Sequence, residues 1–218
     1  MSGGGSAPLV YLHGFASGPG STKAQFFRAR LAELGMALEI PDLAPDFTHL
    51  TITGMLEIVD ASLAAAPRVL LGSSLGGYLA ALAAERQPER VCGLVLFAPA
   101  FGFVARWEAH IGPAAVAGWR AAGVAPVHHY GREREEPLSI ALLDDGRRHP
   151  AEPDPPVQTL VFAGRRDDAV PLAAVEHFAA ARPGQRELVV FDSGHELTDV
   201  LEPMWQRTRS FLGRLSVL

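Results

Sequence analysis

The sequence predicts an α/β fold, in which helices cover both faces of a mostly parallel sheet of about six strands. Short apolar runs recur along the chain, and their hydrophobicity is continuous rather than alternating, which is typical of strands buried on both faces. Helical patterns separate most of these runs, so crossover helices are expected to join the strands. The expected strands are Leu9–Leu12, Ala37–Ile40, Val69–Leu71, Leu94–Phe97, Thr159–Phe162 and Leu188–Phe191.

Helices are expected between and after these strands. In the first two, apolar residues recur at intervals of three or four positions, which places them along one face of a helix. This spacing joins Phe27, Leu31 and Leu34 in the first helix. The expected helices are Ser21–Leu34, Thr51–Ala65, Leu75–Arg86, Leu172–Ala181 and Asp199–Leu215.

One interval breaks this alternation. Residues 101–156 separate the fourth expected strand from the fifth, which is far more than an ordinary loop contains. The interval contains aromatic residues and a highly charged turn, GREREEP. We interpret it as a cap inserted over the carboxyl edge of the sheet, within a single domain of residues 1–218. A crossover helix followed by a loose loop is the alternative.

The composition fits one globular domain. The chain has 218 residues, 48% of them hydrophobic, which is enough for a sizeable core. Its net charge of -5 argues against a nucleic-acid surface. Cys92 is the only cysteine, so no internal disulfide can form, and we expect it in the core at the start of a strand. Without an apolar run of membrane-spanning length or a secretory pattern, the protein is expected in the cytoplasm.

A glycine-rich loop follows the first strand in LVYLHGFASGPGSTKAQ, residues 9–25. Such a loop before a helix usually binds a negative charge. The P-loop pattern G-x-x-x-x-G-K-[ST] is absent here, because Thr22 and not Gly stands directly before Lys23. The dinucleotide pattern G-x-G-x-x-G also fails, because Lys23 stands in place of the third Gly. Nucleotide binding is therefore disfavoured. We expect Lys23 to be solvated on its helix, with contact to substrate as the alternative.

The third strand leads into Gly72-Ser73-Ser74-Leu75-Gly76, a G-x-S-x-G match. In this motif a strand turns sharply into a helix with the central Ser at the apex, and side chains at the two Gly positions would clash. The match lies between an apolar strand and an Ala/Leu-rich helix, which is the context the motif requires. A plain tight turn is the alternative. We therefore expect the Ser74 hydroxyl to be exposed at the carboxyl edge of the sheet.

A serine hydroxyl becomes a strong nucleophile only when a base takes its proton and an acid orients that base. Two stretches after later strands contain suitable groups. GRRDDAVP, residues 164–171, follows the fifth strand, and DSGHE, residues 192–196, follows the sixth. The order Ser, Asp, His along the chain is the one found with this motif.

Four motifs together resemble the α/β-hydrolase superfamily: H-G-F near the start, G-x-S-x-G, G-x-x-D-x-x-V-P and a late S-G-H. The opening HGFASGPGSTKA is also similar to that of small intracellular bacterial serine esterases of the YqiA-like kind. The chain departs from the superfamily in lacking the antiparallel strands that usually precede the His-Gly strand.

This resemblance implies a role for each matching residue. Ser74 would be the nucleophile, and His195 the general base that later protonates the leaving group. Asp167 would be the acid that orients His195, with Asp168 as the competing candidate.

The glycine-rich loop also has a place in this chemistry. Attack by Ser74 on an acyl carbon puts negative charge on the carbonyl oxygen, and two backbone N–H groups should stabilise it. One belongs to Leu75, directly after the nucleophile, and the other to Phe15 in the His-Gly-Phe loop. Gly14 lets the backbone approach closely.

The sequence therefore predicts a serine hydrolase that cleaves carboxylic esters of short to medium acyl chains without a cofactor. A thioesterase, another reaction of this fold (C–C hydrolase, perhydrolase or acyltransferase) and a non-catalytic binding protein are the alternatives. An apolar acyl pocket would contain Phe15 and the expected substrate-binding residues, although half of the aromatic ones could instead form the core of the cap. The expected substrate-binding residues are Phe101, Phe103, Trp107, Trp119 and Val170.

Histidines other than His195 are given structural roles. His128 and His129 are adjacent, so in a strand their side chains point in opposite directions, and no carboxylate-rich pattern surrounds them. We expect no metal site there. His13 is expected to shape the loop by hydrogen bonding.

Overall fold

The computed structural model describes residues 9–218 and has the predicted α/β architecture. Six strands form one sheet in the order β2-β1-β3-β4-β7-β8, and every neighbouring pair is parallel. The stretch before β1, where the antiparallel strands of the superfamily would lie, is outside the described residues. The strands of this sheet are β1 (Leu9–Leu12), β2 (Leu38–Glu39), β3 (Arg68–Ser73), β4 (Val91–Phe97), β7 (Thr159–Gly164) and β8 (Arg186–Phe191).

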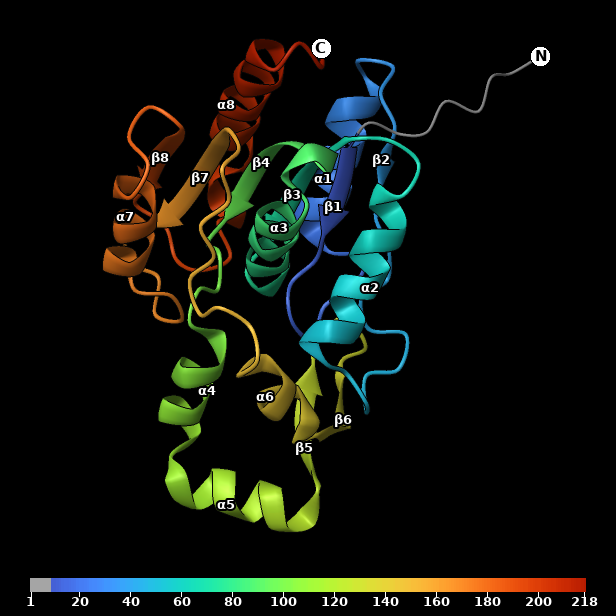
Figure 1. The fold of residues 1–218 in the computed structure, drawn as a ribbon, viewed down its shortest axis with the longest axis vertical. Coiled ribbons are helices and arrows are strands. Elements are labelled where there is room, and N and C mark those ends of the chain that lie inside the picture. Colours follow the sequence, from blue (N-terminus) through green and yellow to red (C-terminus); the bar gives the residue numbers. More distant parts are fainter. Residues whose placement is uncertain (1–8) are drawn as a thin grey trace, which may run out of the picture.

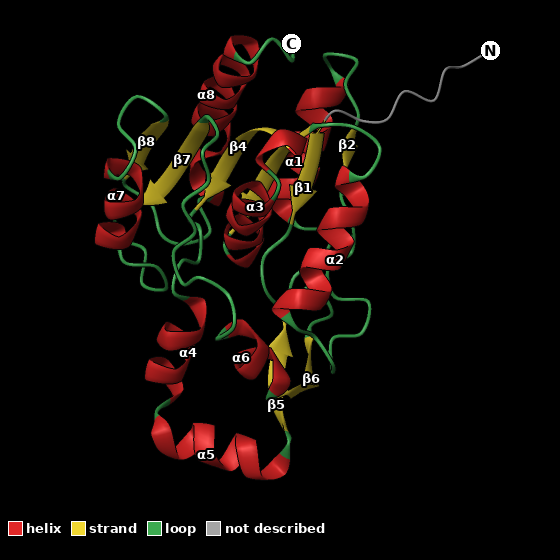
Figure 2. Ribbon diagram, viewed as in Figure 1, coloured by secondary structure: helices red, strands yellow, loops and turns green. Residues whose placement is uncertain are grey.

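Helices cover both faces of the sheet (Figures 1 and 2). Helices α2, α3 and α7 pack on one face, and α1 and α8 pack on the other. The predicted helices are all present, each within a few residues of its expected ends. They are α1 (Thr22–Ala32), α2 (Ile52–Leu63), α3 (Leu75–Arg86), α7 (Leu172–Ala180) and α8 (Leu201–Arg214); two short 3-10 turns are η1 (Pro88–Arg90) and η2 (Thr198–Val200).

Two hydrophobic cores result, because alternate residues of each strand point to opposite faces. In β1, Val10 and Leu12 belong to the core under α2 and α3, whereas Leu9 and Tyr11 belong to the core under α1 and α8. The continuous apolar character that predicted these strands follows from this burial on both sides.

The strand order reverses between β1 and β3. The chain passes from β1 to the short edge strand β2 and then crosses back to β3 on the other side of β1. Leu12 at the end of β1 lies in register with Gly72 near the end of β3. In open parallel sheets, the crevice beyond the carboxyl ends at such a reversal is the usual binding site. The His-Gly-Phe loop and Ser74 therefore emerge side by side.

The interval predicted to form a cap contains three helices and a hairpin. They are α4 (Phe103–Ile111), α5 (Pro113–Ala122), β5 (Val124–His129), β6 (Arg134–Ser139) and α6 (Ala141–Gly146). These elements lie together beyond the carboxyl ends of the strands of the main sheet (Figure 1). The hairpin was not predicted as strands, and one reason is that Pro126 pairs with Pro137 across it, since proline is rare within sheets.

One expectation about the core is wrong. Cys92 is exposed, although it lies in β4. The register between β3 and β4 shifts at this point, because Arg68 pairs with Val91 whereas its neighbour Val69 pairs with Gly93. Cys92 is thus the extra residue of a bulge, which leaves it out of the regular alternation.

The segment that lacked a secretory pattern, residues 1–8, lies outside the described residues. Within residues 9–218, no helix has both the length and the apolar character needed to cross a bilayer.

Candidate active site

Ser74 lies at the turn between β3 and α3 in a backbone conformation that non-glycine residues rarely adopt, with φ 52° and ψ -117°. Backbone hydrogen bonds fix this conformation. The Ser74 N–H donates to Phe97 O at 2.9 Å, and Ser74 O accepts from the N–H groups of Gly77 and Ala100 at 2.9 and 3.0 Å. Strain of this kind costs roughly 1–3 kcal/mol and persists only where the surroundings impose it.

Two glycines allow this turn. A Cβ atom built on Gly76 would lie 2.1 Å from Leu12 O, and one built on Gly72 would lie 2.4 Å from Gly76 O. Any larger residue at either position would have to push the start of α3 away from β1 and β3. The G-x-S-x-G spacing is therefore explained by the close contact between α3 and the end of β1.

The structure brings Ser74, His195 and Asp167 together, from three loops at the same edge of the sheet. His195 Nε2 lies 2.9 Å from Ser74 Oγ, and His195 Nδ1 lies 2.8 Å from Asp167 Oδ2. The His195 side chain is 19% exposed and that of Asp167 only 2%. An imidazole held this way can take a proton from the hydroxyl while the carboxylate stabilises the resulting positive charge.

Asp167 is held as a carboxylate. Burial alone would raise its pKa, but the hydrogen bond to His195 and those from the backbone N–H groups of Val170 and Ala169 lower the pKa below its ordinary value. These two N–H groups donate to Asp167 Oδ1 at 2.7 and 2.9 Å. The neighbouring Asp168 is exposed and makes no hydrogen bond or ion pair with any described residue.

The two expected oxyanion donors flank Ser74. Within residues 9–218, neither the Phe15 N–H nor the Leu75 N–H donates a hydrogen bond to the protein. Leu75 is the first residue of α3, where the helix leaves its N–H groups unpaired. Phe15 follows the end of β1, so both groups are available to an incoming oxygen.

His13 fixes the shape of this loop, as predicted. Its Nε2 accepts a hydrogen bond from the Leu43 N–H at 3.0 Å, and its Nδ1 lies 3.0 Å from Gly14 O. The ring therefore carries its proton on Nδ1. Burial lowers the pKa of His13, which keeps the ring neutral near neutral pH.

The expected substrate-binding residues fall into two groups. Phe103 and Trp107 on α4 are half-buried and contact the Phe15 ring, with centroid separations of 5.9 and 4.8 Å. The others are buried in the protein. Phe101 packs on Phe178, Trp119 packs on Trp107 and donates to Leu138 O, and Val170 lies in the core under α7.

Lys23 is part of the surroundings of this site, and the expectation that it would be solvated is wrong. Its side chain is buried, and Nζ donates a hydrogen bond to the backbone oxygen of Glu196, next to His195. Burial lowers the pKa of Lys23, while the nearby carboxylates of Glu196 and Asp167 raise it. No pattern around Lys23 predicts this contact, because Glu196 is 173 residues away along the chain.

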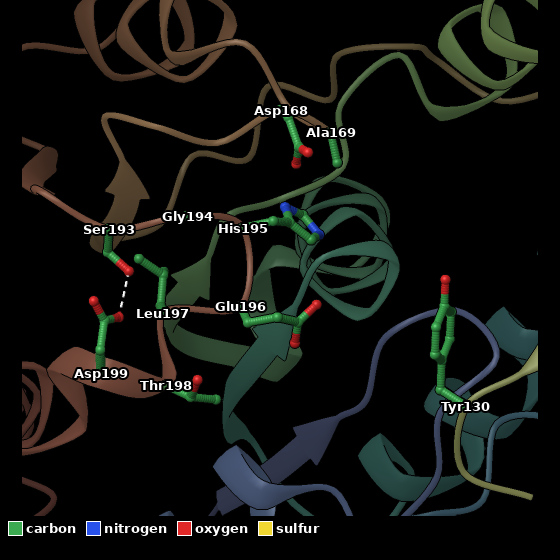
Figure 3. Close-up of a pocket in the computed structure, with 10 residues that line it drawn as sticks. All are labelled: Tyr130, Asp168, Ala169, Ser193, Gly194, His195, Glu196, Leu197, Thr198 and Asp199. Carbon is green, nitrogen blue, oxygen red and sulfur yellow. Dashed lines mark hydrogen bonds between the residues drawn. The ribbon is translucent and has the colours of Figure 1, made fainter. Parts of the chain in front are cut away.

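A cleft of about 470 Å³ opens beside His195. Figure 3 shows Tyr130, at the tip of the β5–β6 hairpin, on the far side of this cleft from residues 193–199, with Asp168 close to His195. Its lining includes the acidic residues Asp168, Glu196 and Asp199, and Ser74 is not part of it.

No group of three or more His, Cys, Asp or Glu side chains gathers in a way that could bind a metal ion within residues 9–218. His128 and His129 do point to opposite sides of β5. His128 is exposed, with Nδ1 3.4 Å from Glu135 Oε1, whereas His129 is buried against the Phe47 ring.

Solved structures share this fold. A putative hydrolase from Agrobacterium vitis S4 has a TM-score of 0.77 at 21% identity, over 93% of this chain and 86% of that one. Alpha/beta hydrolase domain-containing protein 10 from mouse has a TM-score of 0.77 at 20% identity, over 95% of this chain and 90% of that one. Est1E from Butyrivibrio proteoclasticus has a TM-score of 0.77 at 19% identity, over 98% of this chain and 90% of that one. The chain therefore has the α/β-hydrolase fold, as its motifs predicted.

The sequence also identifies the family. The model of an uncharacterised protein family, UPF0227, matches residues 8–212, so the chain belongs to this family. The predicted YqiA-like relationship is confirmed. Comparison with proteins of curated function finds no match.

Gly76→Ala is expected to destabilise the fold by about 1–3 kcal/mol, because the new methyl group overlaps Leu12 O. Urea denaturation would measure this loss. Gly213→Ala on α8 is the control, since a Cβ atom there meets nothing within 4 Å. An unchanged unfolding midpoint for Gly76→Ala would contradict the close packing described above.

The depressed pKa of Asp167 gives a pH-dependent stabilisation. Because the folded state binds the proton less readily than the unfolded state, this stabilisation is present above about pH 4 and is lost as the pH falls below that value. The free energy of unfolding of wild type and Asp167→Asn should be compared at about pH 6 and about pH 3. We expect the advantage of wild type to shrink at the lower pH, and an equal difference at both would refute the interpretation.

Proposed function

We propose that this protein is a serine hydrolase that cleaves carboxylic esters with short to medium acyl chains through a Ser-His-Asp triad. One observation carries the proposal. A continuous hydrogen-bonded chain runs from Ser74 Oγ through His195 to the buried carboxylate of Asp167, next to two backbone N–H groups without a partner in the described residues. This arrangement supplies a nucleophile, a base, an orienting acid and an anion site together.

In the first half of the reaction, His195 Nε2 takes the proton of Ser74 Oγ as the oxygen attacks the ester carbonyl. The carbonyl oxygen becomes an anion, which the N–H groups of Phe15 and Leu75 stabilise. The C–O bond to the alcohol then breaks, and the imidazolium returns its proton to the leaving oxygen. The products are a free alcohol and an acyl group on Ser74.

Water completes the cycle. His195 removes a proton from a water molecule, whose oxygen attacks the acyl carbon, and the same two N–H groups stabilise the second tetrahedral anion. The bond to Ser74 Oγ breaks, the serine oxygen recovers a proton from His195, and the carboxylic acid leaves. No cofactor takes part in this sequence.

The apolar surroundings of the site favour an acyl chain over a polar substrate. Phe103 and Trp107 lie against Phe15, whose backbone would hold the oxyanion, so the acyl chain would lie along these rings. In this proposal residues 101–156 act as a cap over the nucleophile, and α4 forms one wall of the acyl pocket. Cys92 can form no internal disulfide, which fits a cytoplasmic enzyme.

A fluorophosphonate probe tests the nucleophile directly. We expect wild type to gain one adduct by intact mass and Ser74→Ala to gain none, because only an activated serine attacks such a probe at a useful rate. Hydrolysis of 4-nitrophenyl butyrate should fall at least about 10³-fold in Ser74→Ala and in His195→Ala, with circular dichroism checking that both variants fold. Retained hydrolysis in purified Ser74→Ala would refute the proposal.

The two adjacent aspartates allow a matched comparison. Asp167→Asn is expected to lower kcat by about 10²–10⁴-fold, because the amide can no longer stabilise a protonated His195. Asp168→Asn removes the same charge one residue away, from a side chain that is exposed, and its effect should be far smaller. Steady-state kinetics on one ester decide between them. A larger loss in Asp168→Asn would transfer the acid role to that residue.

A further inference from the structure

Arg106 on α4 differs from every other arginine of the 101–156 interval. The other five form ion pairs with carboxylates, and most of these pairs are solvent-exposed. Arg106 is half-buried and makes no hydrogen bond or ion pair with any residue from 9 to 218. Charged side chains away from solvent are normally paired, whereas exposed ones need no partner. In this interval the exposed arginines are paired and the half-buried Arg106 is not.

The position of the guanidinium is defined by its neighbours. It folds back over the start of α4, where a Cβ atom built on Gly102 would lie 3.2 Å from Arg106 Nη1. The segment before Gly102 runs past the nucleophile, since the Ala100 N–H donates to Ser74 O at 3.0 Å. On the same helix, Phe103 and Trp107 contact the Phe15 ring. Arg106 therefore lies at the edge of the proposed acyl pocket.

The carboxylate of Asp167 acts on Arg106 without pairing with it. Burial lowers the pKa of Arg106, and the carboxylate of Asp167 raises it, so the two groups attract each other. However, both oxygens of Asp167 already accept hydrogen bonds, from His195 on one side and from Ala169 and Val170 on the other, and its side chain is 2% exposed. The guanidinium thus keeps its donors free for a ligand.

The cleft beside His195 is lined by acidic residues rather than basic ones. His195 protonates the leaving oxygen, so this cleft is where the alcohol would lie in the proposed reaction. Asp168, Glu196 and Asp199 line it, which disfavours an anionic alcohol. A negative group on the substrate is therefore better placed on the acyl part, where its carboxylate can meet the planar fork of Arg106.

We propose that Arg106 forms an anion-binding subsite for the far end of the acyl group, and that the substrates are monoesters of short dicarboxylic acids. This inference rests on the proposed ester hydrolysis. The methylene groups of the acyl chain would lie along Phe103 and Trp107, and its terminal carboxylate would bind Arg106. Hydrolysis would break the single ester bond by the steps given above and release an alcohol and a dicarboxylate.

The test compares charged esters with neutral ones of the same shape. Monoethyl glutarate carries the charge on the acyl side, and ethyl 5-methylhexanoate replaces that carboxylate by an isopropyl group. O-Butyrylglycolate carries the charge on the alcohol side, and isobutyl butyrate is its neutral counterpart. Proton release at constant pH would give kcat and KM for wild type, Arg106→Gln and Arg106→Lys. Arg207→Gln on α8, an exposed arginine, controls for the change in net charge.

We expect Arg106→Gln to lower kcat/KM for monoethyl glutarate by about tenfold or more, mainly through KM, because a charge-assisted contact is lost. Values for the neutral esters should change by less than about twofold, and Arg106→Lys should retain part of the preference. Equal losses for charged and neutral esters, or no loss, would refute the inference. A loss confined to O-butyrylglycolate would also refute it, because the subsite would then hold the alcohol.

A binding measurement separates this inference from the proposed function. Glutarate itself, titrated by calorimetry, should bind wild type and Arg207→Gln equally and Arg106→Gln about tenfold more weakly. If Ser74 reacts with the fluorophosphonate but glutarate binding does not depend on Arg106, the subsite is refuted and the hydrolase proposal stands. If no ester is cleaved and Ser74 is not labelled while glutarate binding still depends on Arg106, the hydrolase proposal is refuted and an anion site remains.

Discussion

The contact between the start of α3 and the end of β1 is the constraint on which the rest of the site depends. Gly76 lets this helix approach Leu12 so closely that no side chain fits between them. The chain can make that approach only by turning sharply at Ser74, which therefore adopts a positive φ. The same contact places the Leu75 N–H next to the loop of Phe15. One packing requirement thus sets the position of the hydroxyl and of both candidate anion donors.

Three charged side chains lie buried or half-buried around this turn: Asp167, Lys23 and Arg106. Asp167 is almost fully buried and keeps its negative charge because three donors surround it. Lys23 is buried on the α1 side and holds the backbone of Glu196, so it ties the helix after the glycine-rich loop to the loop of His195. Arg106 is half-buried near the site and makes no hydrogen bond or ion pair with residues 9–218.

The interval between β4 and β7 contributes to the site through two contacts with the glycine-rich loop. The α4 rings of Phe103 and Trp107 pack on Phe15. At the tip of the hairpin, the Gly131 N–H donates to Ala16 O at 3.2 Å, directly after Phe15 in the chain. The charged turn that marked this interval in the sequence pairs its own charges, since Arg132 and Arg134 both bind Glu136. The interval therefore braces the loop whose backbone would hold the oxyanion.

The strands of the main sheet and the helices beside them could be predicted from the sequence, because burial on one or both faces imposes a pattern on neighbouring residues. The turn at Ser74 could be predicted as well, since Gly72 and Gly76 stand where the backbone approaches too closely for any side chain. Asp167 and His195 were identified by the loops in which they occur, and their hydrogen bonds required the fold. The fold was needed to see that Lys23 is buried, that Cys92 lies in a bulge and that Arg106 has no hydrogen-bond or ion-pair partner among residues 9–218. Each of these depends on side chains brought from distant parts of the chain, and such contacts leave no periodic pattern in the residues around them.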